Sequence, residues 1–201
     1  MKKMIEYGVR LWKLEKGCYM KYFIEIGSNN FDTLLPLAEN DWSGVIVEPI
    51  EKYLNTLPKL DNVKYINAAV TDNDVPAMMS VYNEDVCIKD SDFRGMSTLE
   101  THGVVEVNAH LIHKELVNCI TYDRLTSEYC ADFTQLDFLK IDTEGHDLKI
   151  LQAVDFNSVL RPLIIKIEHK HCDGLQITDL LKSNGYFVMP ERYDIYAISF
   201  K

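Results

Sequence analysis

Ionisable residues interrupt two segments of the chain that are otherwise apolar. Lys140 and Asp142 alternate at the end of LDFLKID, and Lys166 and Glu168 alternate at the end of LIIKIE. In a β-strand, a spacing of two puts both side chains of each pair on one face. A buried charge costs several kcal/mol unless it is paired, so these four residues form either a satisfied ion network or a functional site. We favour the functional site.

A turn with a single glycine follows an earlier apolar segment. In FIEIGSNN, Glu25 and Gly27 end the segment, and Ser28 and Asn29 follow. Glu48 ends the next apolar segment about 20 residues after the glycine, where an acidic side chain can bind both hydroxyls of a ribose. The pattern G-x-G-x-x-G, which brings the backbone close to a pyrophosphate, is absent. These residues favour a nucleoside cofactor without a pyrophosphate over NAD or FAD.

Short apolar segments alternate with helical patterns, and these elements must position the charged residues. The alternation predicts a doubly wound α/β fold, with a mostly parallel sheet and helices on both of its faces. Ligands of such sheets bind beyond the carboxyl ends of the strands. The last two strands are joined by too short a link for a parallel crossover, so the final strand is antiparallel. Strands are predicted at residues 21–27, 44–48, 63–70, 136–142, 163–168, 186–189 and 193–200, and helices at 32–40, 51–57, 147–153 and 175–183.

The length of 201 residues predicts one domain over residues 1–201. Residues 1–20 are expected to form a helical extension that packs on the sheet or over the pocket. Residues 73–118 show only a weak secondary-structure pattern and are expected to form an irregular insertion. Within it, Arg94, Ser97 and Thr98 either close over an acceptor as a lid or belong to an inert loop. The chain could also be one module of a larger enzyme.

The charge balance limits the classes of partner. Lys plus Arg number 21 and Asp plus Glu number 31, which gives a net charge of −10. A negative protein repels phosphate backbones, so nucleic acid is a disfavoured partner. The sequence has no stretch of the roughly 18 to 20 apolar residues that a membrane span needs, and no signal-peptide pattern. We expect a cytoplasmic protein that does not engage a membrane.

Four segments carry a resemblance to a known family. FIEIGSNN, the strand end Val47-Glu48-Pro49, NAAVTD and above all LKIDTEGHDLKIL resemble the FkbM-type S-adenosylmethionine-dependent methyltransferases. The stretch KIDTEG is similar to the most distinctive motif of that family, K-I-D-x-E-G, and the resemblance covers residues 22–169. The chain departs from the pattern at Glu25, where the family usually has Asp, and at Phe31 and Ala153, where it usually has Gly.

The resemblance implies a class I methyltransferase with S-adenosylmethionine across the ends of the first three strands. Its sheet has seven strands in the order 3-2-1-4-5-7-6, and the last strand is antiparallel. The cofactor-binding residues that it implies are Gly27 and Asn29 at the methionine end, Glu48 at the ribose, and Ala68, Ala69 and Asp72 at the adenine, together with Glu25, Ser28 and Asp142.

The acceptors that the resemblance implies are sugar hydroxyls on glycans or glycosylated metabolites, among them deoxysugars such as rhamnose. A hydroxyl needs a base or a divalent metal to lose its proton near neutral pH. Asp142, Glu168 and His169 end neighbouring strands, as in magnesium-dependent catechol-type O-methyltransferases, and are expected to bind Mg²⁺ or Mn²⁺. His146 and His169 are the candidate bases, beside a catalytic Asp142. Glu144 is expected to hold the loop through backbone hydrogen bonds.

Three other functions stay open. Methylation of an RNA ribose 2′-hydroxyl uses similar groups, although the net charge and the lack of a basic stripe disfavour it. A non-catalytic nucleoside-binding module fits the replacement of the turn glycine by Phe31. A dehydrogenase is disfavoured because the turn has only one glycine. Other domains of a glycan-synthesising enzyme are expected partners.

Overall fold

The computed structural model describes residues 20–31, 33–83, 86–87, 93, 95–100 and 108–200. The helix expected over residues 1–20 and the lid residue Arg94 therefore lie outside the described residues. Among the helices that the structure describes, none is long and apolar enough to cross a membrane.

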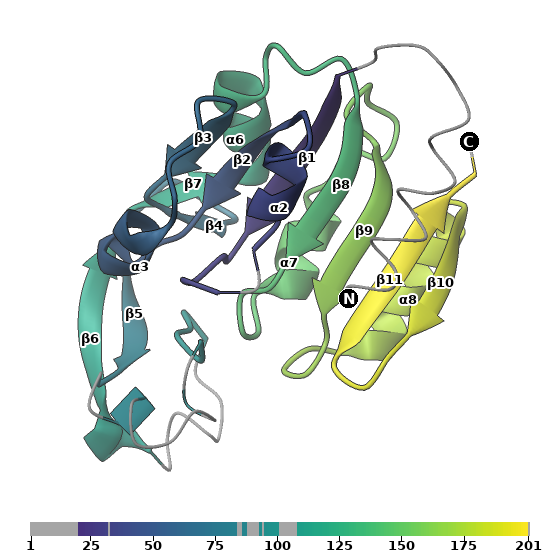
Figure 1. Ribbon diagram of the computed structural model, residues 1–201. Helices are drawn as coiled ribbons and strands as arrows, with labels where there is room; N and C mark the ends of the chain where they lie inside the picture. The colour runs from purple at the N-terminus through teal and green to yellow at the C-terminus, as the bar shows by residue number, and fades with distance from the viewer. Residues whose placement is uncertain are drawn as a thin grey trace.

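A seven-stranded sheet forms the centre of the molecule (Figure 1). Its order is β3-β2-β1-β8-β9-β11-β10, which becomes 3-2-1-4-5-7-6 when these seven strands are numbered along the chain, as predicted. Strand β11 is antiparallel to both of its neighbours, and the pairs among β3, β2, β1, β8 and β9 are parallel. The strands are β1 (Lys21–Ile26), β2 (Trp42–Val47), β3 (Val63–Ile66), β8 (Leu136–Ile141), β9 (Pro162–Glu168), β10 (Tyr186–Pro190) and β11 (Asp194–Ser199).

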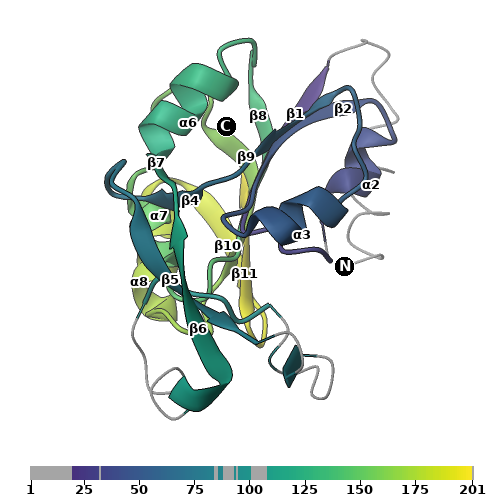
Figure 2. The ribbon, with the colours of Figure 1, turned by 90° about the vertical axis from the view of Figure 1, so that its left-hand side faces the viewer.

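Helices cover both faces of the sheet (Figure 2). On one face, buried residues of β1 and β2 such as Phe23 and Ile46 pack with leucines of α2 and α3. On the other face, Ile24 and Leu139 belong to the larger core, which also includes buried residues of the other three helices. The alternation of strand side chains thus buries both faces, as in a doubly wound sheet. The helices are α2 (Leu35–Ala38), α3 (Glu51–Thr56), α6 (Tyr122–Tyr129), α7 (Asp147–Gln152) and α8 (Gly174–Ser183).

The prediction of one strand over residues 63–70 was wrong. The chain leaves the central sheet after β3, and β4 (Ala69–Thr71) pairs instead with β7 (Cys119–Thr121). Asn67 lies at the break, where its side-chain amide donates hydrogen bonds to the carbonyls of Glu48 and Pro49 at 3.0 and 2.9 Å. These bonds turn the backbone away from the sheet edge.

The insertion expected to be irregular contains a β-hairpin. Strand β5 (Ala77–Tyr82) pairs antiparallel with β6 (Ile112–Val117), which follows a short 3₁₀ helix at Ala109–Leu111. The two strands extend away from the central sheet at the lower left of Figure 1. Ser80 of β5 exchanges backbone hydrogen bonds with Thr98 at 2.9 and 3.0 Å. Residues 95–100, which we call the roof segment, are thereby held against the inner edge of the hairpin.

Candidate active site

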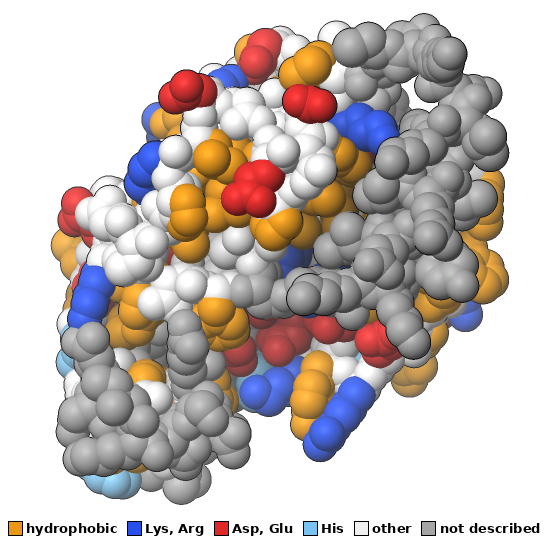
Figure 3. Space-filling view, in the orientation of Figure 1, with side chains coloured by type: hydrophobic (Ala, Val, Ile, Leu, Met, Phe, Trp, Pro, Cys, Tyr) orange, Lys and Arg blue, Asp and Glu red, His pale blue; other side chains and the backbone are white. Residues whose placement is uncertain are grey.

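A cleft opens at the carboxyl ends of β1, β2, β8 and β9, with a volume of about 220 Å³. Its remaining walls come from β4, β5 and the roof segment. Asp and Glu side chains gather in a hollow at this end of the sheet, near the lower centre of Figure 3. Of the residues predicted to form the site, the cleft is lined by Gly27, Ser28, Asn29, Glu48, Ala68, Ala69, Lys140, Asp142, His146 and Glu168.

Glu25, predicted to bind the cofactor, lies beneath the cleft and is fully buried. Its Oε1 is 3.1 Å from the ammonium nitrogen of Lys140, and its Oε2 accepts a hydrogen bond from the backbone N–H of Leu34 at 2.8 Å. Lys140 also lies 3.8 Å from Asp142. The contacts of Glu25 thus join β1 to β8 and to the start of α2, and its side chain supports the floor of the site.

Asp72 and His169 also lie outside the described lining of the cleft. Asp72 is exposed, and its carboxylate accepts a hydrogen bond from the side chain of Asn73. The ring of His169 lies against Gly174, with Nε2 3.1 Å from the carbonyl oxygen of Glu191. The sequence placed His169 directly after a strand end, but its ring lies between the start of α8 at Gly174 and the β10–β11 turn at Glu191. It does not face the cleft.

Gly27 joins the ends of two central strands. Its N–H donates to the carbonyl of Val47, and its φ of +79° is a conformation that favours glycine. A Cβ atom here would lie 1.8 Å from the carbonyl oxygen of Asp142. The glycine is required because β1 and β8 approach each other where the cleft begins. Asn29 follows at φ 47°, in the left-handed region that Asn tolerates better than most residues.

Glu48 forms a buried wall of the cleft, with 4% of its surface exposed. Its two carboxylate oxygens accept hydrogen bonds from the backbone N–H groups of Asn29 at 2.7 Å and Ile50 at 2.9 Å. Burial raises the pKa of this carboxyl to about 7, although the two hydrogen bonds oppose the shift. The side chain is fixed and available to accept hydrogen bonds from a diol.

An apolar slot lies next to Glu48. It is the part of the cleft lined by Ala68 and Ala69, which were predicted to meet an adenine, and by Val70, Met79 and Leu99. Apolar side chains suit contact with a flat aromatic ring. Met79 and Leu99 come from β5 and the roof segment, so no local sequence pattern linked them to the glycine turn.

Asp147 holds the loop that joins β8 to α7. Its carboxylate accepts hydrogen bonds from the backbone N–H groups of Thr143 and Gly145, both at 2.9 Å. Burial raises the pKa of Asp147 to about 6. The sequence prediction gave this role to Glu144, which was wrong, because φ at Glu144 is 54° and its side chain points into the acidic cluster instead.

Three carboxylates converge at the acidic end of the cleft. Asp142, Glu144 and Glu168 each offer an oxygen, and these atoms lie within 4.8 Å of one another. Glu168 is 9% exposed, and its Oε2 has no hydrogen-bond partner in the described part of the chain. Burial, and then the charges of Glu144 and Asp142, raise the pKa of Glu168 to about 9. Burial likewise raises that of Glu144 to about 7. We define these three residues as the acidic cluster, which could hold a divalent cation.

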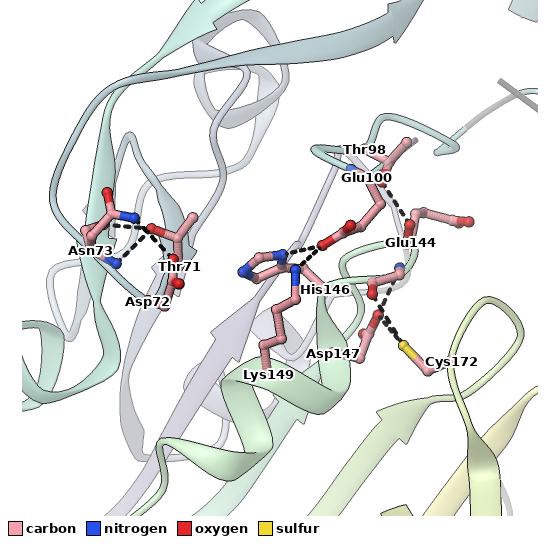
Figure 4. Close-up of polar contacts among 11 residues, drawn as sticks. Thr71, Asp72, Asn73, Thr98, Glu100, Glu144, His146, Asp147, Lys149 and Cys172 are labelled. Carbon is pink, nitrogen blue, oxygen red and sulfur yellow. Dashed lines mark hydrogen bonds and ion pairs between the residues drawn. The ribbon is translucent and has the colours of Figure 1, made fainter. Parts of the chain in front are cut away.

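His146 lies at the N-terminal end of α7 and lines the cleft. Its Nδ1 is 2.7 Å from a carboxylate oxygen of Glu100, and Figure 4 shows the other ring nitrogen pointing away from Glu100. That nitrogen, Nε2, is buried without a hydrogen-bond partner among the described residues. Thr98 secures the roof segment by donating to the carbonyl of Glu144 at 2.7 Å. Ser97 lines the cleft, whereas Thr98 is fully buried.

The strand order, the cleft at the carboxyl ends of the strands and the acid at the end of β2 are those of a doubly wound protein that binds a nucleoside. Residues 25–188 match the methyltransferase FkbM domain, and the chain belongs to this family. No curated protein matches it.

Several solved structures are similar to the chain. Precorrin-6y C5,15-methyltransferase from Geobacter metallireducens is 15% identical, with a TM-score of 0.42 over 95% of this chain and 84% of that one. The methyltransferase domain of METTL16 is 14% identical, with a TM-score of 0.43 over 98% and 66%. The human methyltransferase 10 domain containing protein is 12% identical, with a TM-score of 0.39 over 98% and 81%.

Proposed function

We propose that this methyltransferase methylates a sugar hydroxyl of a glycan or glycosylated metabolite, with help from a divalent cation. One observation carries the proposal: oxygens of Asp142, Glu144 and Glu168 lie within 4.8 Å of one another at the cleft, and Glu168 Oε2 is buried without a hydrogen-bond partner among the described residues. An alcohol has a pKa far above neutrality, so its methylation needs a base or a cation beside the oxygen. An amine that is neutral at working pH needs neither group.

The residues of the cleft fit the cofactor. S-adenosylmethionine supplies the sulfonium methyl group when it is bound. Glu48 would accept hydrogen bonds from the ribose hydroxyls, and the slot around Ala68 and Met79 would enclose the adenine ring. Ser28 and Asn29, which follow the Gly27 turn, would face the methionine end.

A divalent cation fits the acidic cluster. Mg²⁺ binds oxygen ligands at about 2.1 Å, so ligand atoms on opposite sides of the ion lie about 4.2 Å apart. The oxygens of Asp142, Glu144 and Glu168 lie within 4.8 Å of one another, so each would move inward to bind the ion, and Glu144 would turn from His171, whose Nε2 is 3.2 Å from its Oε2. Glu168 Oε2 is an independent indication, because a buried oxygen without a partner is costly unless something binds it. A cation here would supply positive charge beside the acceptor oxygen.

His146 is the proposed base. Its Nε2 has no hydrogen-bond partner among the described residues and would accept the proton of a hydroxyl, while Nδ1 is hydrogen-bonded to Glu100. Asp142 and Glu168 are proposed as cation ligands with Glu144 in place of His169, whose ring is held against Gly174.

The chemistry of the acidic end supports a sugar as the acceptor. Carboxylates and the Ser97 hydroxyl accept hydrogen bonds from the several hydroxyls of a sugar, and two adjacent hydroxyls can reach one cation. A ribose in RNA offers a similar group, but the net charge of −10 opposes binding of its phosphates.

The test is calorimetric titration of S-adenosylmethionine and S-adenosylhomocysteine, with NAD⁺ as the control, followed by methyl-transfer assays on sugar and RNA acceptors. We expect micromolar binding of the first two compounds and transfer to a sugar, which stops in EDTA and returns with Mg²⁺ or Mn²⁺. Absence of binding would refute the cofactor assignment, transfer only to RNA would refute the acceptor, and full activity in EDTA would refute the cation.

Cation binding has a readout that does not need turnover. Mn²⁺ titration followed by electron paramagnetic resonance should show one bound ion in the native protein. Glu168→Gln should weaken its binding at least tenfold, because one of three charged ligands is lost. Glu191→Gln, at an exposed position outside the cleft, is the matched control and should leave Mn²⁺ binding unchanged. Equal affinity in both variants would remove Glu168 from the site.

A further inference from the structure

We infer that Glu100 is a positioning residue that holds His146 with the Nε2 lone pair facing the acceptor. The inference rests on the proposed function, in which His146 accepts the hydroxyl proton. Glu100 belongs to the roof segment and is 46 residues from His146 in the chain. It would act on the reaction only through the imidazole ring.

The contact between Glu100 and His146 is short and directional. Glu100 Oε1 lies 2.7 Å from His146 Nδ1, in the range of a charge-assisted hydrogen bond. The side chain of His146 is 9% exposed and that of Glu100 is 31% exposed, so water competes little at the imidazole. Burial raises the pKa of Glu100, but hydrogen bonds from Lys149 and His146 outweigh it, so the net shift is downward. Glu100 is therefore a carboxylate at neutral pH.

An ionised carboxylate can only accept hydrogen bonds, so the proton of a neutral His146 must be on Nδ1. Nε2 then carries the lone pair, which a base needs. A neutral imidazole in water prefers the opposite tautomer, which carries its proton on Nε2. In that tautomer Nε2 could not accept the proton of the sugar hydroxyl. The hydrogen bond from Glu100 thus selects both the tautomer and the orientation of the ring.

Lys149 makes it possible to separate this role from simple anchoring of the roof segment. Its ammonium nitrogen is 2.6 Å from the same Oε1 of Glu100, and its side chain is 53% exposed. Lys149→Met would remove one tie between α7 and the roof segment and leave the bond from Glu100 to His146 in place. Glu100→Gln would keep the shape of the side chain. Its amide can donate a hydrogen bond as well as accept one, so it would no longer require the proton of His146 to be on Nδ1.

The experiment is nitrogen-15 NMR of the imidazole groups, at a pH where the ring is neutral, on the full chain with S-adenosylhomocysteine as the probe ligand. We expect the Nδ1–H tautomer of His146 in the native protein and in K149M, and a shift towards Nε2–H in E100Q. With a sugar acceptor, kcat should fall about 10- to 100-fold in E100Q and less than threefold in K149M. The affinity for S-adenosylhomocysteine should stay within twofold in both variants.

The outcomes separate the inference from the function on which it rests. A native protein without methyl transfer would refute the proposed function, while the tautomer of His146 would still be measured. An unchanged Nδ1–H tautomer in E100Q would overturn the inference. Equal losses of kcat in E100Q and K149M would also overturn it, because both variants would then act by loosening the roof segment.

Discussion

Replacement of Glu48 by glutamine should change how the stability of the protein depends on pH. The pKa of Glu48 is raised by burial from 4.5 to about 7, and the charges of Glu25 and Asp142 add to the rise. Between pH 4.5 and 7 the folded state therefore keeps a proton that the unfolded state has lost. The free energy of unfolding falls as pH rises through this window, by about 3 kcal/mol from this group alone.

Glu48→Gln removes this dependence because an amide does not ionise. The amide also has one acceptor oxygen for two backbone N–H groups, those of Asn29 and Ile50, so one N–H loses its partner. That loss costs about 1 to 3 kcal/mol. Native protein should thus be the more stable of the two at pH 4.5, and its advantage should disappear or reverse by pH 8.

Urea denaturation of both proteins at half-unit pH intervals from 4.5 to 8 measures this difference. Asp147, Glu144 and Glu168, whose pKa values are also raised, contribute in the same direction to both proteins and cancel in the comparison. Two stability curves that run parallel across the window would refute the assignment of a buried, high-pKa carboxyl to Glu48. If the native protein instead became increasingly more stable than Glu48→Gln as pH rises, the upward direction of the pKa shift would be wrong.

Gly27→Ala should lower the free energy of unfolding by more than about 3 kcal/mol, because left-handed strain adds to the overlap with Asp142. Gly185→Ala, at the same φ of +79°, measures the strain alone in a chemical denaturation series and should cost much less. Asp147→Asn should cost about 1 to 3 kcal/mol and lower the melting temperature by several degrees in calorimetry, unless the loop relaxes to rescue the orphaned N–H. His146→Ala should reduce kcat at least about 100-fold in the methyl-transfer assay with unchanged cofactor affinity, and a fully active variant would exclude it as the base.

The central sheet could be predicted from the sequence because its strands carry strong local signals. Segments such as those around Ile24, Val45 and Ile165 are apolar on both faces, and short links between the last strands fix their direction. Strands β6 and β7 and helix α6 were not predicted. Strand β6 has mostly exposed side chains and is stabilised by its pairing with β5, and such tertiary pairing leaves little trace in a local pattern.

In the candidate site, too, some residues could be placed from the sequence and others could not. Residues at strand ends, such as Glu48, Asp142 and Glu168, could be placed in one cleft because parallel strands end at one edge. Glu100 could not, because the contact with His146 depends on how the roof segment returns to α7. Lys166, predicted to belong to the site, lies 3.4 Å from Asp194 of β11 and outside the described lining. The alternation of side chains along a strand predicts the face on which a charged residue lies. It does not predict which residue of a neighbouring strand that charge contacts.

The junction of β1 with β8 has a consequence for the synthesis of the protein. Hydrogen bonds and ion pairs across it, such as Tyr22 with Asp137 and Glu25 with Lys140, join residues 115 positions apart. At a translation rate of about 5 to 20 residues per second, β1 waits roughly 6 to 23 seconds before its partner strand is made. During that time the edge of β1 that pairs with β8 lacks its partner strand, and Tyr22 and Glu25 lack their contacts with Asp137 and Lys140. Nascent chains stalled before β8 should therefore bind chaperones through the first strand, and release should coincide with the emergence of the second half of the cleft.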